Sequence, residues 1–141
     1  MIAYFDTSAV IPLIIEEPAS ITCDRLWNDA DRIVSVRLLY PEARAALAKA
    51  RRMQRITCEQ LDAATAELDS ILRQVDHIEI TAELARAAGD LAAVHGLRGY
   101  DAVHLAGAVA ATDDELVLVT GDTDLGCAAS SLGLAVAFTA A

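Results

Sequence analysis

The sequence predicts an α/β/α sandwich whose central sheet has about five mostly parallel strands, built as one domain over residues 1–141. Three observations support this fold class. Short apolar segments alternate with helical segments along the chain. Several expected strands, such as 2–5 (IAYF) and 134–138 (LAVAF), are apolar at nearly every position, which is typical of strands covered by helices on both faces. No repeat, low-complexity tract or linker divides the chain.

The first half of the chain contains two expected strands and four expected helices. Pro18 suits the first turn of a helix, because the N–H that proline lacks has no partner there. Thr57 and Gln60 have the spacing of a capping box, in which each side chain bonds the other residue's backbone N–H. In order, the elements are a strand at 2–5, helices from about Ser8 and about Pro18, a strand at 32–36, a helix from Pro41 to about 55, and a helix at 57–75.

The second half alternates three expected strands with three expected helices. Gly96 lies where a helix is expected to end, and glycine readily adopts the left-handed conformation of a helix C-cap. In order, the elements are a strand at 77–80, helices at 81–96 and 100–112, a strand at 115–120, a short helix at 122–133, and a strand at 134–138.

The composition is that of a globular protein, with 55% hydrophobic and 23% charged residues. The longest apolar runs are too short to span a bilayer, and the first residues lack the basic region of a signal peptide, so we expect a cytoplasmic protein without a membrane segment. The three cysteines include no CxxC pair, which argues against a disulfide framework or a zinc site. A net charge of −10 disfavours a broad basic surface for nucleic acid.

Aspartates directly follow two of the expected strands. Asp6 follows the strand at 2–5, and Asp122 and Asp124 follow the strand at 115–120. The carboxyl ends of parallel strands meet at one edge of a sheet, where α/β proteins build their sites. Each of these residues also has a purely structural interpretation, because aspartate is a favoured N-cap at a strand-to-helix junction.

Two further acids fall on the apolar faces of expected helices. Glu42 has only leucine and alanine three and four residues away, so no basic side chain can pair with it along the helix. A half-buried glutamate without a partner is costly. Asp101 shares a helix face with Leu105 and Ala108, although a carboxylate near a helix start is also stabilised by the helix dipole.

If these acids converge, four or five carboxylates share one pocket. Such a cluster repels itself and raises its own pKa values unless a cation enters it. Carboxylate oxygens without histidine or cysteine select a hard cation, Mg²⁺ or Mn²⁺. A water bound to such an ion can attack a phosphodiester in line, and this chemistry requires no histidine base.

Four segments of the chain resemble the PIN-domain ribonucleases, and within them the VapC-type toxins of type II toxin–antitoxin pairs. The segments are YFDTSAVIPL, LLYPEARAALA, LRGYDAVHLAGA and LVTGDTDLGCAA. Their order and spacing make the resemblance specific, and it extends over essentially the whole chain. The resemblance implies a single PIN domain with metal-dependent endoribonuclease activity.

The resemblance also implies which residues form the site and which partners the protein has. The catalytic and metal-binding acids would be Asp6, Glu42, Asp101 and Asp122, with Asp124 as a fifth metal ligand and with Ser8 and Thr120 as supporting hydroxyls. His104 is expected to pack beside the site rather than to bind metal. The partners would be an RNA substrate, a second copy of the chain in a homodimer, and a small VapB-like antitoxin that covers the acidic pocket, often with an arginine.

Two other functions fit parts of the pattern. Receiver and aspartyl-phosphatase-like phosphotransfer domains also group acids at strand ends. However, the only lysine, Lys49, lies on a middle helix, and Ser8 stands where the phosphatase pattern requires an acid. A catalytically silent PIN-fold binding module is the remaining alternative, and loss of a pocket acid would indicate it. No such acid is missing.

The net charge is unfavourable for an enzyme that binds RNA. Bound metal ions would offset part of the negative charge in the pocket. The sequence also lacks a group of aromatic residues on which bases could stack. The arginines of one helix and its end are interpreted either as a solvated face or as local phosphate contacts; they are Arg44, Arg51, Arg52 and Arg55.

Overall fold

The structure is a computed structural model that describes residues 1–112 and 114–140. A five-stranded sheet forms the central layer, in the order β3-β2-β1-β4-β5, and each neighbouring pair of strands is parallel. The predicted fold class is therefore confirmed, and β1 lies at the centre of the sheet. The strands are β1 (Ile2–Phe5), β2 (Arg32–Val36), β3 (Val75–Ile78), β4 (Leu116–Thr120) and β5 (Ala135–Phe138).

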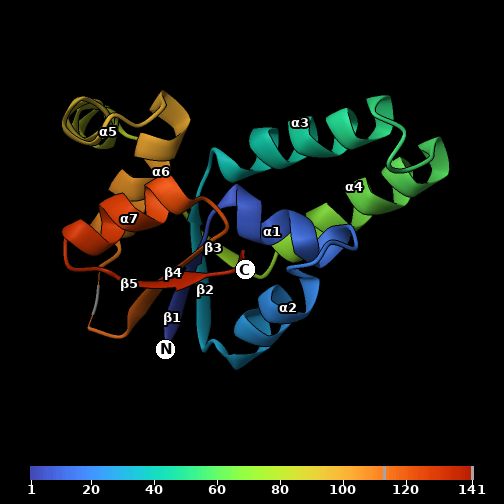
Figure 1. The fold of residues 1–141 in the computed structure, drawn as a ribbon, viewed down its shortest axis with the longest axis horizontal. Helices are drawn as coiled ribbons and strands as arrows, with labels where there is room; N and C mark the ends of the chain where they lie inside the picture. The colour runs from blue at the N-terminus through green and yellow to red at the C-terminus, as the bar shows by residue number, and fades with distance from the viewer. Residues whose placement is uncertain (113, 141) are drawn as a thin grey trace.

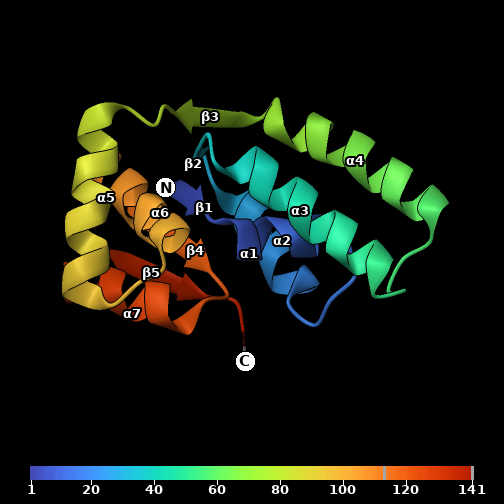
Figure 2. The ribbon, with the colours of Figure 1, turned by 90° about the horizontal axis from the view of Figure 1, so that it is seen from above.

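Helices cover both faces of this sheet (Figures 1 and 2). One layer contains α1 (Thr7–Ile14), α2 (Ser20–Asp29), α3 (Leu39–Arg52) and α4 (Cys58–Leu72). The other layer contains α5 (Ala82–His95), α6 (Gly99–Ala110) and α7 (Thr123–Ser131). Among the described residues, no helix has the length and apolarity needed to cross a membrane.

The core is divided in two by the alternation of side chains along the strands. Ala3 and Phe5 of β1 pack into the cluster formed with α1, α2, α3 and α4. Tyr4, between them, points to the opposite face and packs with α6 and α7. Figure 2 shows α3 and α4 side by side on the side of the sheet away from α5, so that this pair extends beyond the strands.

Two local predictions are confirmed by hydrogen bonds and backbone geometry. Gln60 N donates to Thr57 Oγ1 at 3.1 Å and Thr57 N donates to Gln60 Oε1 at 2.8 Å, which completes the capping box of α4. Gly96 ends α5 with a φ of 65°, a left-handed conformation that favours glycine.

Several predicted boundaries differ from the structure, and the starts of β3, α3 and α2 differ by about two residues. β3 begins at Val75 rather than at 77, because α4 ends at Leu72 and Val75 is already buried in the sheet core. Helix α3 begins two residues before Pro41; proline is tolerated there because the first-turn N–H groups have no partner within the helix. Helix α2 begins after Pro18 rather than at it.

Candidate active site

Asp6 lies at the junction between β1 and α1 and is only 4% exposed. Its carboxylate accepts three hydrogen bonds: from the Ser8 hydroxyl at 2.7 Å, from the Thr120 hydroxyl at 2.7 Å, and from the backbone N of Ala9 at 3.2 Å. The bond from Ala9 makes Asp6 the N-cap of α1, as its structural interpretation predicts. The donors come from two elements, α1 and β4, which together fix Asp6 at the end of β1.

Thr120 connects Asp6 to the second strand-end acid. The register of β1 and β4 brings the ends of these two strands together, and the Thr120 hydroxyl that donates to Asp6 accepts from the backbone N of Asp122 at 3.0 Å. The Asp122 side chain in turn accepts from the backbone N of Leu125 at 3.1 Å and caps α7. Both strand-end acids therefore cap a helix and lie at the same sheet edge.

Glu42 lies in the first turn of α3 and is half-buried. Its Oε1 accepts from the Thr7 hydroxyl at 2.8 Å and lies 2.5 Å from Nε2 of His104. The prediction that Glu42 has no side-chain partner is wrong. Its partners come from α1 and α6, and spacing along a single helix gives no indication of them.

His104 is buried, at 2% exposed, and is held at both ring nitrogens. Its Nδ1 lies 2.9 Å from the Tyr4 hydroxyl. Burial raises the pKa of Tyr4 well above its ordinary value, so the phenol keeps its proton and can donate to Nδ1. This leaves the Nε2 proton for Glu42. A Cβ at Gly107 would lie 3.0 Å from Tyr4 Oη, so glycine permits α6 to pack this closely on the phenol.

Asp101 lies in the first turn of α6 and is bound by an arginine of this chain. Arg98 Nε donates to Asp101 Oδ2 at 3.0 Å, and Nη2 of the same guanidinium lies 4.0 Å from Asp122 Oδ2. The guanidinium also lies over the Tyr100 ring, 5.0 Å from its centroid, and the Arg98 side chain is 67% exposed. An exposed positive charge therefore bridges Asp101 and Asp122.

Burial and neighbouring charges disfavour ionisation at two of these acids. Burial raises the pKa of Asp6, although the neighbouring His104 and the hydroxyls of Ser8 and Thr120 oppose the rise. Burial also raises the pKa of Asp101, and the charges of Asp122 and Glu42 add to this effect while Arg98 opposes it. Asp101 is thus close enough to Asp122 and Glu42 to interact with them electrostatically, and these three acids would be stabilised by a cation.

Comparison with known proteins identifies the architecture that carries these acids. The model of the PIN domain family matches residues 3–129. The chain belongs to the PIN-domain family. This PIN-domain chain is 40% identical over 136 residues to ribonuclease VapC45 of Mycobacterium tuberculosis strain CDC 1551 / Oshkosh and, equally, to ribonuclease VapC49 of strain ATCC 25618 / H37Rv. The alignments cover 96% of this chain and 94% of each relative, so the resemblance to VapC-type toxins is confirmed.

A solved structure shows the same fold. A toxin–antitoxin complex from Klebsiella pneumoniae matches this PIN-domain chain with a TM-score of 0.61 and 20% sequence identity. The match covers 86% of this chain and 87% of that one. At this identity the likeness supports the fold alone.

The acids of this PIN domain suit a hard cation in kind, but they do not form a ready-made cage. Within residues 1–112 and 114–140, no three histidine, cysteine, aspartate or glutamate side chains are grouped closely enough to hold a metal ion. Carboxylates without a cation between them repel each other. Here His104 contacts Glu42 and Arg98 contacts Asp101, and these contacts reduce the repulsion in the absence of a metal ion. Glu42 Oε2 and Asp101 Oδ1 accept no hydrogen bond within the described residues, so they can bind a cation.

The site therefore has two halves, which differ in how they are held. The fixed half is Asp6 and Glu42, bound by the adjacent hydroxyls of Ser8 and Thr7. The open half is Asp101 and Asp122, bridged by Arg98. The expected fifth acid, Asp124, is exposed in the first turn of α7 and forms no hydrogen bond or ion pair with the described residues.

Proposed function

We propose that this VapC-type PIN protein hydrolyses RNA as the toxin of a toxin–antitoxin pair, using Mg²⁺ or Mn²⁺ held by Asp6, Glu42, Asp101 and Asp122. The observation that carries the proposal is the arrangement of these four carboxylates around one sheet edge, where Thr120 connects Asp6 with Asp122 and Asp101 interacts with Asp122 and Glu42, in a chain 40% identical to curated ribonucleases. A divalent ion held by such carboxylates supplies an activated water and offsets charge that develops on the phosphate.

The side chains of the chain itself have distinct tasks in this proposal. Ser8 and Thr120 hold Asp6 so that its position does not depend on the cation. His104 holds Glu42 by one oxygen and leaves the other oxygen available. Fixed donors of this kind lower the cost of assembling the site. Asp124 lies two residues after Asp122 and is exposed. It can act as an additional ligand only if its side chain turns toward Asp101 and Asp122.

The partner proposal rests on the open half of the site. Arg98 shows that a guanidinium fits between Asp101 and Asp122, so an arginine of an antitoxin segment can make the same contact and cover the acids. The Klebsiella pneumoniae protein that shares this fold is part of a toxin–antitoxin complex, and we propose by analogy that this chain has such a partner. We further propose that the chain is a single PIN domain that forms a homodimer and works in the cytoplasm, where its RNA substrate is.

Cleavage of a labelled RNA by the purified protein tests the proposed activity. Cleavage should require Mg²⁺ or Mn²⁺, stop in EDTA, and leave 5′-phosphate and 3′-hydroxyl ends, because a water rather than the 2′-hydroxyl attacks. Asp101→Asn should abolish it, whereas Asp90→Asn, at an exposed acid of α5, should not. Cleavage that survives EDTA, or that leaves 2′,3′-cyclic phosphate ends, would contradict the proposal.

A further inference from the structure

The positive charges of this acidic protein are concentrated in one segment. The chain carries 11 lysines and arginines against 21 acids. Residues 43–58 contain no acid and five of these positive charges. We call four of them, at and beyond the last turn of α3, the basic end: Lys49, Arg51, Arg52 and Arg55. An anionic ligand that is repelled elsewhere can bind here.

Most of the basic end is not neutralised by ion pairs. Elsewhere, Arg32 pairs with Asp76 at 2.8 Å and Arg37 with Glu79 at 2.6 Å. Three members of the basic end have no carboxylate within ion-pair distance among residues 1–112 and 114–140, as is also true of scattered arginines such as Arg73 and Arg86; the three are Lys49, Arg51 and Arg52. The helix dipole explains why positive side chains are favoured at the C-terminal end of α3. It does not explain why these side chains have no ion pairs with acids.

A groove connects the basic end with the acids. The groove has a volume of about 390 Å³, and its polar lining is Ser8 of α1, Lys49 of α3, Arg55 and the acid Glu17, which pairs with Arg55. Ser8 donates to Asp6, so the groove starts beside the fixed half of the site. Glu42 and Lys49 are seven residues apart on α3 and therefore share one face, roughly 10 Å apart along the axis. The groove thus leads along α3 from the acids to free positive charge.

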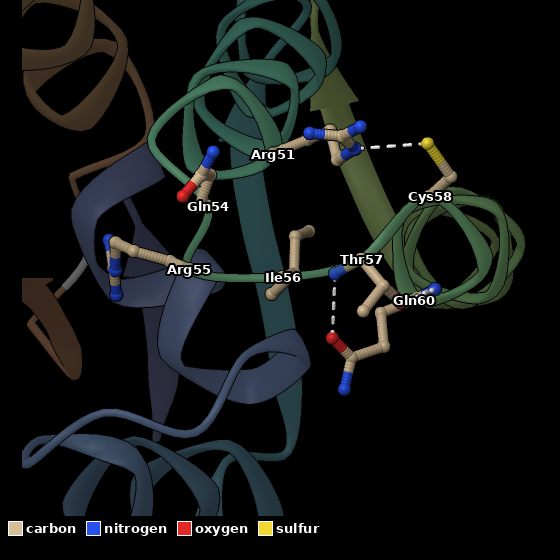
Figure 3. Close-up of a pocket in the computed structure, with 7 residues that line it drawn as sticks. All are labelled: Arg51, Gln54, Arg55, Ile56, Thr57, Cys58 and Gln60. Atoms are coloured by element: carbon tan, nitrogen blue, oxygen red, sulfur yellow. Dashed lines mark hydrogen bonds between the residues drawn. The ribbon is translucent and has the colours of Figure 1, made fainter.

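A second hollow adjoins this groove and is rich in hydrogen-bond donors (Figure 3). Its volume is about 320 Å³, and Arg55 lines both hollows. In Figure 3, Arg51 points toward Cys58, whose sulfur accepts from Arg51 Nε at 3.0 Å, while Arg55 extends to the opposite side. Arg55 pairs with Glu17 at 3.3 Å in an exposed ion pair, and such pairs are weak enough to be exchanged for a phosphate.

We propose that the RNA strand next to the cleaved bond lies in the groove between α1 and α3, with its phosphates bound by Lys49 and Arg55. This inference rests on the proposed ribonuclease function and adds where the substrate's backbone is held. Phosphate contacts position a strand without reading its sequence, and they compensate for the repulsion by the acids. An acidic segment of a protein partner would also be attracted by this charge. RNA is favoured because it must place a phosphate at the acids where the groove begins.

Two double variants with the same change in net charge test the proposal. Lys49→Gln/Arg55→Gln removes charge from the groove, and Arg73→Gln/Arg86→Gln removes charge from exposed positions at the end of α4 and on α5. Binding of a 5′-fluorescein-labelled single-stranded RNA of mixed sequence is measured by fluorescence anisotropy in EDTA at several salt concentrations. A gel verifies that the RNA stays intact, and circular dichroism verifies folding.

The groove variant should lose about fivefold in affinity per lost phosphate contact at 100 mM salt, and the slope of log K against log salt should fall by about 0.7 per contact. The control variant should change much less. Equal losses in the two variants, or an unchanged slope in the groove variant, would overturn the proposal. Lys49→Arg should retain binding, because the positive charge remains.

One further measurement distinguishes an RNA site from a site for an acidic protein segment. A second distinguishes failure of the groove proposal from failure of the proposed ribonuclease function. If the groove variant binds RNA normally but loses binding to a fluorescein-labelled oligoglutamate, the basic end binds an acidic protein segment and the RNA proposal is wrong. Metal-dependent cleavage by the wild-type protein is scored separately. Failure of the ribonuclease function would appear as no cleavage by any variant, whereas failure of the groove proposal would appear as normal wild-type cleavage with equal RNA affinity in both double variants.

Discussion

The fixed and open halves of the site carry the same chemical groups but are held in opposite ways. Asp6 is 4% exposed and accepts three hydrogen bonds, and Glu42 contacts a histidine that is itself buried. Asp101 and Asp122 share one guanidinium that is 67% exposed. The difference indicates that the fixed half is set by buried contacts, whereas the charges of the open half are compensated by an exposed guanidinium.

The fixed half should be the more sensitive to mutation. Asp6→Ala removes the acceptor of three hydrogen bonds and leaves the buried Thr120 hydroxyl without its acceptor, so we expect a loss of about 2–4 kcal/mol in unfolding free energy. Cleavage should fall by roughly a hundredfold or more. Urea denaturation and the RNA assay measure the two effects, with Asp90→Ala as the control. Wild-type stability in Asp6→Ala would contradict the division into halves.

His104 is expected to connect the stability of the fixed half to its cation. His104→Phe keeps a ring in the core but removes the contacts to Glu42 and Tyr4, which should cost about 1–3 kcal/mol and weaken Mn²⁺ binding. Tyr4→Phe removes only the hydrogen bond between the Tyr4 hydroxyl and His104 Nδ1 and leaves the contact between His104 and Glu42, so it should affect Mn²⁺ binding less. Denaturation and calorimetric titration with Mn²⁺ separate the effects. Equal Mn²⁺ affinities in the wild type and His104→Phe would show that His104 is purely structural.

Arg98 should behave in the opposite way, with little effect on stability and a clear effect on binding. Its ion pair with Asp101 is exposed, so Arg98→Gln should change the unfolding free energy by less than about 1 kcal/mol. Removal of the competing guanidinium should raise Mn²⁺ affinity several-fold in calorimetric titration. Arg86→Gln on α5 is the matched control. A decrease in Mn²⁺ affinity would instead make Arg98 a support for the open half.

The smallest expected effect is a pH dependence in the absence of metal. Burial raises the pKa of Asp101 above its ordinary value of 3.8, so this residue favours the folded state most at low pH, and that contribution is lost as the pH rises through the raised pKa. Asp101→Asn should therefore gain stability relative to the wild type between pH 4 and neutral pH. Thermal unfolding in EDTA across this range measures the difference. If the stability advantage of Asp101→Asn over the wild type instead grew as the pH was lowered, the pKa of Asp101 would be lowered by folding rather than raised, and the prediction would be wrong.

The sequence predicts the layers of the fold more completely than the contacts of the site. Apolar strand segments and the cap at Thr57 depend on neighbours in sequence, and they appear where expected. The contact between Glu42 and His104 depends on how α3 and α6 meet across the sheet, which no local pattern encodes. The pair of Arg98 and Asp101 does have a local signal, because residues three apart on a helix are neighbours.

Boundary errors have a similar cause. The pattern HIEI predicts a strand at 77–80, but burial of Val75 in the completed sheet sets where pairing begins. Likewise, the positions of the acids in the sequence predict one shared cage. Their actual grouping also depends on two other side chains: Arg98 contacts Asp101, and His104 contacts Glu42.

The central position of β1 has a consequence for how the protein is made. β1 is synthesised well before β4, yet Ile2 pairs in register with Leu116 of β4. Pairing between such distant segments is slow and must wait for most of the chain to be synthesised. Asp6 obtains its Thr120 hydroxyl only at that step. The site therefore cannot assemble until β4 and Asp122 are present, and it forms together with the completed sheet.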